Sequence, residues 1–162
     1  MEWKTHVGAG VLCAIAGMAV FGTGGIRYLD AILWTVAWAL MPLAERHLPL
    51  SHRSPALHSV FTALAAAAAV YALSFVADLS LLSLHGAAFA AVGIGSHILV
   101  DSFTTTGVPL AYPLLRRRHV LFPYAGHRLR YADDAESGRV QYAALLLLIG
   151  LLVLEVLGIA PV

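Results

Sequence analysis

The sequence has 162 residues, of which 60% are hydrophobic and 12% are charged, and its mean hydropathy is +0.81. An ordinary soluble domain has roughly 45–50% apolar and about 25% charged residues, so this composition excludes a typical water-soluble fold. The net charge of +1 gives no reason to expect a nucleic-acid partner. Because Cys13 is the only cysteine, an intramolecular disulfide and a thiolate-rich metal site are both excluded.

Apolar segments follow one another along the chain and predict an all-α, polytopic membrane bundle of about five transmembrane helices. They cover residues 7–21, 28–44, 56–77, 79–100 and 140–160. Each approaches or exceeds the roughly 20 residues that cross about 30 Å of hydrocarbon, and the first two are at the short end. We therefore expect residues 1–162 to form a single membrane-embedded domain.

The first two segments each have ionisable residues at one end. His6 stands where the first segment begins, and the glycine-rich turn at 22–25 leads to the second. Glu45 and His47 follow the second segment. A chain that crosses twice brings these three residues back to the same side of the membrane.

The third segment is preceded by a short polar loop that contains His52 and Arg53, and His58 opens the segment itself. A lone interfacial histidine is usually structural, whereas several at the same depth favour a shared site. Arg53 either anchors a lipid headgroup or binds a substrate phosphate. Asp78 marks a tight connection to the fourth segment, so the third and fourth are expected to form a helical hairpin.

The fourth segment ends in the pair His97 and Asp101, which are four residues apart. At that spacing both side chains project from one helix face and can meet. An imidazole and a carboxylate so placed can share a zinc-like metal ion. The alternative is an interfacial His–Asp hydrogen bond that only ends the helix.

The long stretch at 102–139 is rich in threonine, proline, glycine, arginine and aspartate, and it is predicted to be a loop. Within it, Arg116, Arg117 and Arg118 are most simply a patch for anionic lipid. Membrane lipid is therefore an expected partner of the chain.

The distribution of charge predicts the orientation. Five crossings place residues 1–6, 45–55 and 102–139 on one side, and of the ten Lys and Arg residues only Arg27 falls on the other. By the positive-inside rule the first side is cytoplasmic. We expect a multi-pass protein of the inner or plasma membrane, with its N-terminus and its site on the cytoplasmic side.

The histidines follow the same division, which the charge rule does not require, since only His85 of the eight lies toward the other side. Imidazoles and carboxylates without thiolates suit zinc, manganese or iron. Such an ion activates water by lowering its pKa. We therefore predict a divalent metal, with zinc as the first candidate.

These motifs together resemble the YdjM-like family of membrane-bound metal-dependent hydrolases. The most specific block is Ser96-His97-x-x-x-Asp101-x-x-Thr104-x-x-Gly107-x-Pro109-Leu110 with Pro113, and Thr5-His6, Pro42 with a following acid, and His52-Arg53 through His58-Ser59 precede it in order. That family is distantly similar to zinc-dependent phospholipase C and the single-strand nuclease P1. The resemblance implies that His6, His58, His97 and Asp101 occupy metal-ligand positions and that the substrate is a phosphoester.

The sequence also departs from the family pattern. The family commonly carries Asp-x-Asp after the proline that follows the second helix, whereas here Pro42 is followed by Leu43, Ala44 and Glu45. The first acid is thus missing and Glu45 stands in place of the second. The spacing from His52 to His58 is one residue longer than the usual pattern.

The leading hypothesis is a phosphoesterase at the cytoplasmic membrane surface that acts on lipid or another phosphoester. In it, Glu45 is a further ligand or general base, Arg53 stabilises phosphate charge, and the metal ligands are His6, His52, His58, His97 and Asp101. A second hypothesis is a metal-binding or transport protein without hydrolysis. A third is a structural or regulatory membrane protein descended from such enzymes.

Overall fold

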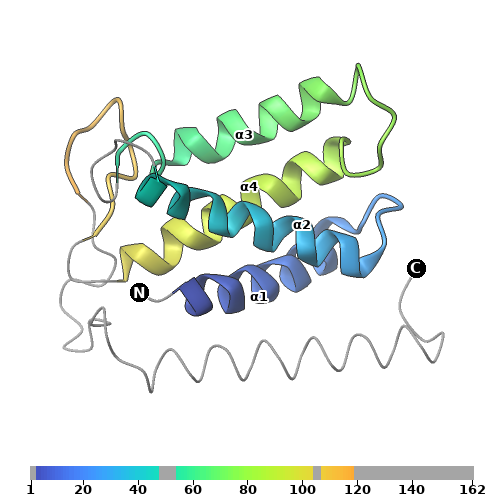
Figure 1. Ribbon diagram of the computed structural model, residues 1–162, viewed down its shortest axis with the longest axis horizontal. Coiled ribbons are helices and arrows are strands. Elements are labelled where there is room, and N and C mark those ends of the chain that lie inside the picture. Colours follow the sequence, from blue (N-terminus) through green and yellow to red (C-terminus); the bar gives the residue numbers. More distant parts are fainter. Residues whose placement is uncertain (1–2, 48–53, 104–106, 119–162) are drawn as a thin grey trace.

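The computed structural model describes residues 3–47, 54–103 and 107–118. They form α1 (Trp3–Phe21), α2 (Tyr28–Leu40), a 3-10 helix η1 (Met41–His47), α3 (Val60–Leu73) and α4 (Leu84–Ser102). Figure 1 shows the four α-helices running side by side, and α4 packs against each of the other three. No strand occurs among these residues, so the predicted all-α class is confirmed for them.

Among the described residues, two helices have the length and hydropathy of a membrane span, namely α1 and α4, with 19 residues each. Each rises about 28 Å at 1.5 Å per residue, close to the thickness of the hydrocarbon core. α3 is equally apolar but has 14 residues, and α2 has 13 before it continues into η1. The fifth predicted segment, 140–160, lies outside the described residues.

The predicted boundaries of the third and fourth segments are wrong, because capping serines set the helix ends. The third segment was expected over 56–77, but α3 begins at Val60, where Ser59 accepts a hydrogen bond from the Thr62 N–H. α4 begins at Leu84 rather than at 79, because the Ser83 hydroxyl accepts from the Gly86 N–H. Such caps satisfy backbone donors that the first helical turn leaves open.

The connection between α3 and α4 therefore spans residues 74–83 and is not a tight turn at Asp78. Residues 74–77 form turns through backbone hydrogen bonds to carbonyls three or four residues earlier. The two helices still pack along each other. The predicted hairpin is thus confirmed, with a longer connection than expected.

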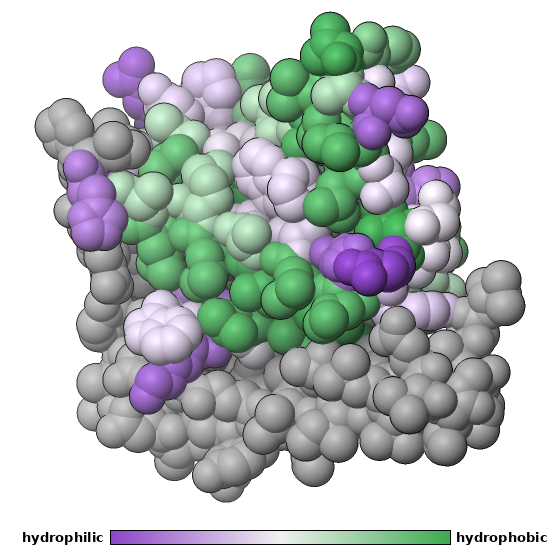
Figure 2. Space-filling model, turned by 45° about the vertical axis from the view of Figure 1, so that its right-hand side comes forward, coloured by the Kyte–Doolittle hydropathy of each residue, from purple (hydrophilic) through white to green (hydrophobic). Residues whose placement is uncertain are grey.

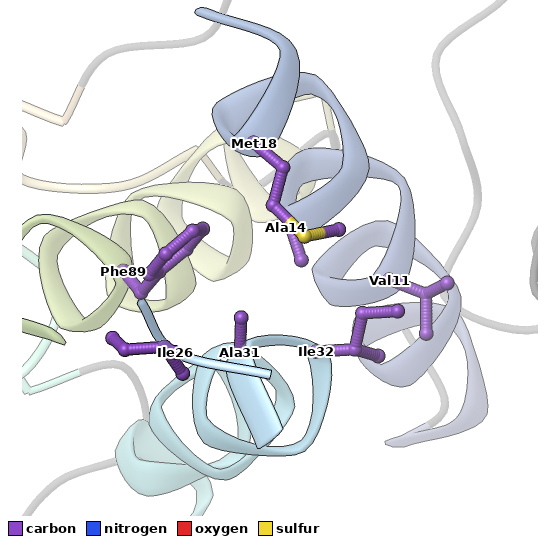
Figure 3. Close-up of a cluster of buried hydrophobic side chains, with 7 residues drawn as sticks. All are labelled: Val11, Ala14, Met18, Ile26, Ala31, Ile32 and Phe89. Carbon is purple, nitrogen blue, oxygen red and sulfur yellow. The ribbon is translucent and has the colours of Figure 1, made fainter. Parts of the chain in front are cut away.

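The apolar core between α1, α2 and α4 fills the half of the bundle around the 22–27 turn. Figure 3 shows its side chains pointing toward one another from these three helices and from the turn. They are Val11, Ala14, Met18, Ile26, Ala31, Ile32 and Phe89. This packing holds α1 and α4 in register.

Two glycines allow the backbones of neighbouring helices to come close. A Cβ at Gly10 of α1 would lie 3.2 Å from the Cβ of Ala39 in α2. A Cβ at Gly93 of α4 would collide with the Thr35 carbonyl oxygen and lie 2.7 Å from the Cβ of Trp38. Small residues at helix contacts are the usual means of tight packing in membranes. α2 is thus held close to both α1 and α4.

The outer surface of the described part carries many apolar side chains. Figure 2 shows apolar residues over much of the visible face. The most exposed of the large ones are Val20, Phe75, Val76 and Leu114, all at 73% or more. A surface of this kind suits contact with lipid and would be a liability in water.

Candidate metal centre

Five ionisable side chains gather at one end of the bundle and are almost completely buried. Their relative exposures are His6 1%, Glu45 4%, His58 1%, His97 0% and Asp101 4%. They come from α1, from η1, from the loop before α3 and from α4. Burial of so many ionisable groups is costly, which makes the cluster a functional candidate by default. The predicted convergence of the histidine-bearing segments is confirmed for these residues.

Asp101 lies at the centre of the cluster. Its Oδ2 is 3.6 Å from Nε2 of His97, so the pair predicted from the four-residue spacing does meet. The same Oδ2 is 3.7 Å from Nε2 of His58, and Oδ1 is 3.6 Å from Nε2 of His6. One carboxylate therefore faces three imidazoles.

The His97 ring is oriented by a backbone carbonyl of α2. Its Nδ1 lies 2.7 Å from the carbonyl oxygen of Ala39. Because a carbonyl can only accept, Nδ1 carries the hydrogen, and in the neutral ring Nε2 presents its lone pair. The close approach of α2 and α4 at Gly93, one turn before His97, brings this carbonyl within reach.

The His58 ring is oriented in the same way. Its Nδ1 lies 3.2 Å from the carbonyl oxygen of Ser54, which again places the hydrogen on Nδ1. Nε2 of His58 then faces Nε2 of His97 at 3.3 Å. Two lone pairs and the Asp101 carboxylate thus converge, an arrangement that a cation or an added proton stabilises. Metal-bound histidines commonly donate their other N–H to a carbonyl in this manner.

His6 completes the group by stacking on His97. The two ring centroids are 3.8 Å apart with planes at 11°. One ligand atom each from His6, His97 and Asp101 lie within 4.8 Å of one another. Donors around a tetrahedral zinc ion with bonds near 2.0–2.1 Å are roughly 3.3–3.4 Å apart, so separations of 3.3–3.7 Å in the cluster fit such an ion. This donor set, called the metal-binding group below, could therefore hold a metal ion, and its geometry does not indicate which metal.

Glu45 occupies a different position in the cluster. Its Oε2 accepts a hydrogen bond from the Ser54 N–H at 3.0 Å and lies 3.6 Å from Nδ1 of His58. It thus contacts His58 on the ring edge away from Asp101 and ties η1 to the loop before α3. The contributions of Ser54 and of the Ala39 carbonyl were not predicted, because backbone groups leave no signal in a residue pattern. The only sequence feature that relates to these backbone contacts is Gly93, a small residue at the close contact of α4 with α2.

The remaining predicted residues fall elsewhere. His52 and Arg53 lie outside the described residues. His47 is exposed at the end of η1, and Leu43, at the position of the missing acid, is half-buried. His85 sits at the opposite end of the bundle, where a Cβ on Gly24 would collide with its ring.

Comparison with known protein families places the chain in a membrane protein family. A sequence model described as YdjM inner membrane protein matches residues 1–161, which is nearly the whole chain. No curated protein and no solved structure matches. The similarity to zinc-dependent phospholipase C and nuclease P1 that the motifs imply stays a prediction.

Proposed function

We propose a function for this chain from the premise that it belongs to the YdjM inner membrane protein family. It acts as a membrane-bound, metal-dependent hydrolase of phosphoesters at the cytoplasmic membrane surface. The observation that carries the proposal is the convergence of Nε2 of His58, Nε2 of His97 and Oδ2 of Asp101 on one buried point. Backbone carbonyls hold both rings so that acceptors, not donors, face that point.

His6, His58, His97 and Asp101 would hold the metal, and His52 would be a further ligand from the neighbouring loop. The donor set suits zinc first, and manganese or iron as alternatives. A bound divalent ion would supply a Lewis acid that lowers the pKa of water and offsets charge on a phosphoryl oxygen.

Glu45 and Arg53 complete the proposed site. The Glu45 carboxylate lies 3.6 Å from Nδ1 of His58 and would stabilise positive charge on that ring when its Nε2 binds a cation. Its role is then to orient and polarise His58, in place of the ligand or general-base role expected from the sequence. Arg53 would bind the phosphate of the substrate, because a guanidinium forms two parallel hydrogen bonds to phosphate oxygens.

The same proposal includes five membrane crossings in a single domain. α1 and α4 are two of them, and α2 with η1 gives a third, since 13 α-helical and seven 3-10 residues rise about 34 Å together. α3 and residues 140–160 are the remaining two. The positive charge at 102–139 supports a cytoplasmic loop there, with the metal centre on the same side.

The substrate class follows from the surroundings of the cluster. Exposed apolar side chains on the bundle support lipid as the neighbouring medium. A phospholipid headgroup would reach the cluster from the membrane surface while its apolar part stays among the helices. Other phosphoesters would have to arrive from the cytoplasm.

The first test is elemental analysis of detergent-purified protein beside the double variant His97→Ala, Asp101→Ala. We expect stoichiometric zinc, manganese or iron in the wild type and none in the double variant. His85→Ala removes an imidazole at the other end of the bundle and is the matched control, which should keep its metal. Well-folded wild type that takes up no metal after reconstitution would contradict the proposal.

A second candidate function is metal binding without turnover, favoured by the burial of all five side chains to 4% exposure or less. Structural metal sites are closed, whereas catalytic sites keep a position open for substrate. Cleavage of phosphodiesters or phospholipids to a phosphomonoester and an alcohol by the wild type, absent in the double variant, supports the hydrolase. Bound metal with no turnover across these substrates supports the second candidate.

A further inference from the structure

An open groove of about 420 Å³ runs along the contact between α3 and α4. It lies on a different face of α4 from the metal-binding group. Its lining consists of Val60, Ala63, Ala91, Gly95, Ile98, Leu99, Ser102 and Leu110. The Ser102 hydroxyl already donates to the Leu99 carbonyl at 2.6 Å, so the groove offers no side-chain donor that calls for a polar ligand.

The groove has the length of one membrane leaflet. It extends along α4 from Ser102, beside Asp101, to Ala91, deeper in the span. From Ala91 to Ser102 the helix rises roughly 16 Å, and half of a hydrocarbon core of about 30 Å is roughly 15 Å. Its outer end coincides with the end of α4 that carries the metal-binding group.

The middle of the groove is kept open by a glycine. No described atom lies within 4 Å of the position that a Cβ on Gly95 would take. Val60 and Leu99, two of the large apolar side chains of the lining, are 48% and 45% exposed. An unbranched hydrocarbon chain fits a groove of this length, volume and polarity.

Positive charge lies near the outer end. The Val60 N–H donates to the Leu110 carbonyl at 2.9 Å, which fixes the segment 107–118 beside the start of α3. Leu114 and Leu115 are 75% and 52% exposed, and Arg116–Arg118 after them are exposed as well. Exposed leucines followed by arginines suit the boundary between acyl chains and anionic headgroups.

We propose that this groove binds one acyl chain of an anionic phospholipid from the leaflet on the side of the metal centre, with the lipid phosphate near Arg116–Arg118. The inference rests on the membrane placement given under the proposed function and not on hydrolysis. A lipid held there is presented beside the metal-binding group, whether or not it is turned over.

The test uses the full chain in vesicles of phosphatidylcholine that contain phosphatidylglycerol with a photoreactive acyl chain. Gly95→Leu places a large side chain in the empty groove, and Ala91→Leu is a second blocking variant on the same face. Ala68→Leu adds the same side chain to the outer surface of α3 and is the control. We expect labelling of the peptide with residues 91–102 in the wild type and in Ala68→Leu, and its loss in both blocking variants.

Two further readouts separate this inference from the proposed function. Metal content should be unchanged in Gly95→Leu, because the groove and the metal-binding group lie on different faces of α4. Exchange of Arg116–Arg118 for glutamine should lower labelling by phosphatidylglycerol and leave labelling by a photoreactive phosphatidylcholine unchanged.

Either of two outcomes would overturn the inference. One is labelling of residues 91–102 that is equal in the wild type and in both blocking variants. The other is a wild-type oligomer that the blocking variants dissociate while labelling stays constant, which would assign the groove to a second copy of the chain.

Discussion

Gly93 and Gly95 stand two residues apart on α4 and face opposite kinds of environment. A Cβ on Gly93 would collide with the Thr35 carbonyl oxygen of α2, whereas a Cβ on Gly95 would meet no described atom within 4 Å. The side of α4 toward α2 is thus closed and carries the oriented His97. The face of α4 that carries Gly95, at the edge of the α3–α4 contact, is open and apolar and is called the open side below.

Under the two proposals above, one helix would serve two kinds of ligand. A metal ion needs donors held to within a few tenths of an ångström, which only a tight helix contact provides. A hydrocarbon chain needs space and an apolar lining, and tolerates variation in both. The predictions below change one side of α4 at a time.

The largest effect is expected from Asp101→Asn, which removes the charge from the centre of the closed side. Metal affinity should fall by about 100-fold or more, since loss of an outer partner alone typically costs 10–100-fold. The amide can donate to a neighbouring imidazole Nε2, so the melting temperature of the metal-free protein should not drop. Metal titration and thermal unfolding in detergent measure the two quantities.

A different result for Asp101→Asn would be equally informative. Metal affinity equal to that of the wild type would show that the carboxylate is only a hydrogen-bond partner of the histidines. The interpretation of the cluster as a metal centre would then fail, while the lipid groove would be unaffected.

The second prediction concerns the tight contact itself. Gly93→Ala forces α2 away from α4 and should cost about 1–3 kcal/mol of stability, as overpacked cores do. It should also weaken metal binding, because the Ala39 carbonyl moves away from Nδ1 of His97. A melting temperature and a metal affinity equal to those of the wild type would show that the two helices can separate without cost.

How far the fold could be predicted from the sequence is clear at the helix ends. Hydropathy located the four segments that are helical in the described residues, and with the connection at Asp78 it predicted the α3–α4 hairpin. It placed the ends of α3 and α4 wrongly, because Ser59 and Ser83 cap the helices inside stretches that are apolar on average. Side-chain capping is a local hydrogen bond that a hydropathy average does not detect.

At the site, the contact between side chains on one helix was predictable, whereas the contacts with backbone carbonyls of other segments were not. The spacing of His97 and Asp101 predicted a contact that the structure contains, because a helix has a fixed period. The part played by the Ala39 and Ser54 carbonyls depends on how closely separate segments pack. That information lies in tertiary contacts, and among them only the close α2–α4 contact is indicated in the sequence, by the small residue Gly93.

The third prediction concerns Glu45, which supports His58 from the side of the ring away from Asp101. Glu45→Ala removes the acceptor for the Ser54 N–H and the neighbour of His58, so metal affinity should fall by about 10–100-fold. Glu45→Gln keeps an amide oxygen that can still accept from Ser54 and should restore part of the loss. Equal metal affinities for Glu45→Ala and the wild type would show that the contacts of Glu45 with Ser54 and His58 do not position the His58 ring.

The smallest effect is expected on the open side. Gly95→Ala adds a methyl group to empty space and removes the conformational freedom of a helical glycine, so the protein should gain about 0.5–1 kcal/mol of stability. Metal affinity should not change, because His97 and Asp101 face away from the groove. Measured beside Gly93→Ala by thermal unfolding, the same methyl group should therefore act with opposite sign two residues apart. Destabilisation by both substitutions would mean that α3 lies closer to α4 in the membrane, and the groove would then be too narrow for an acyl chain.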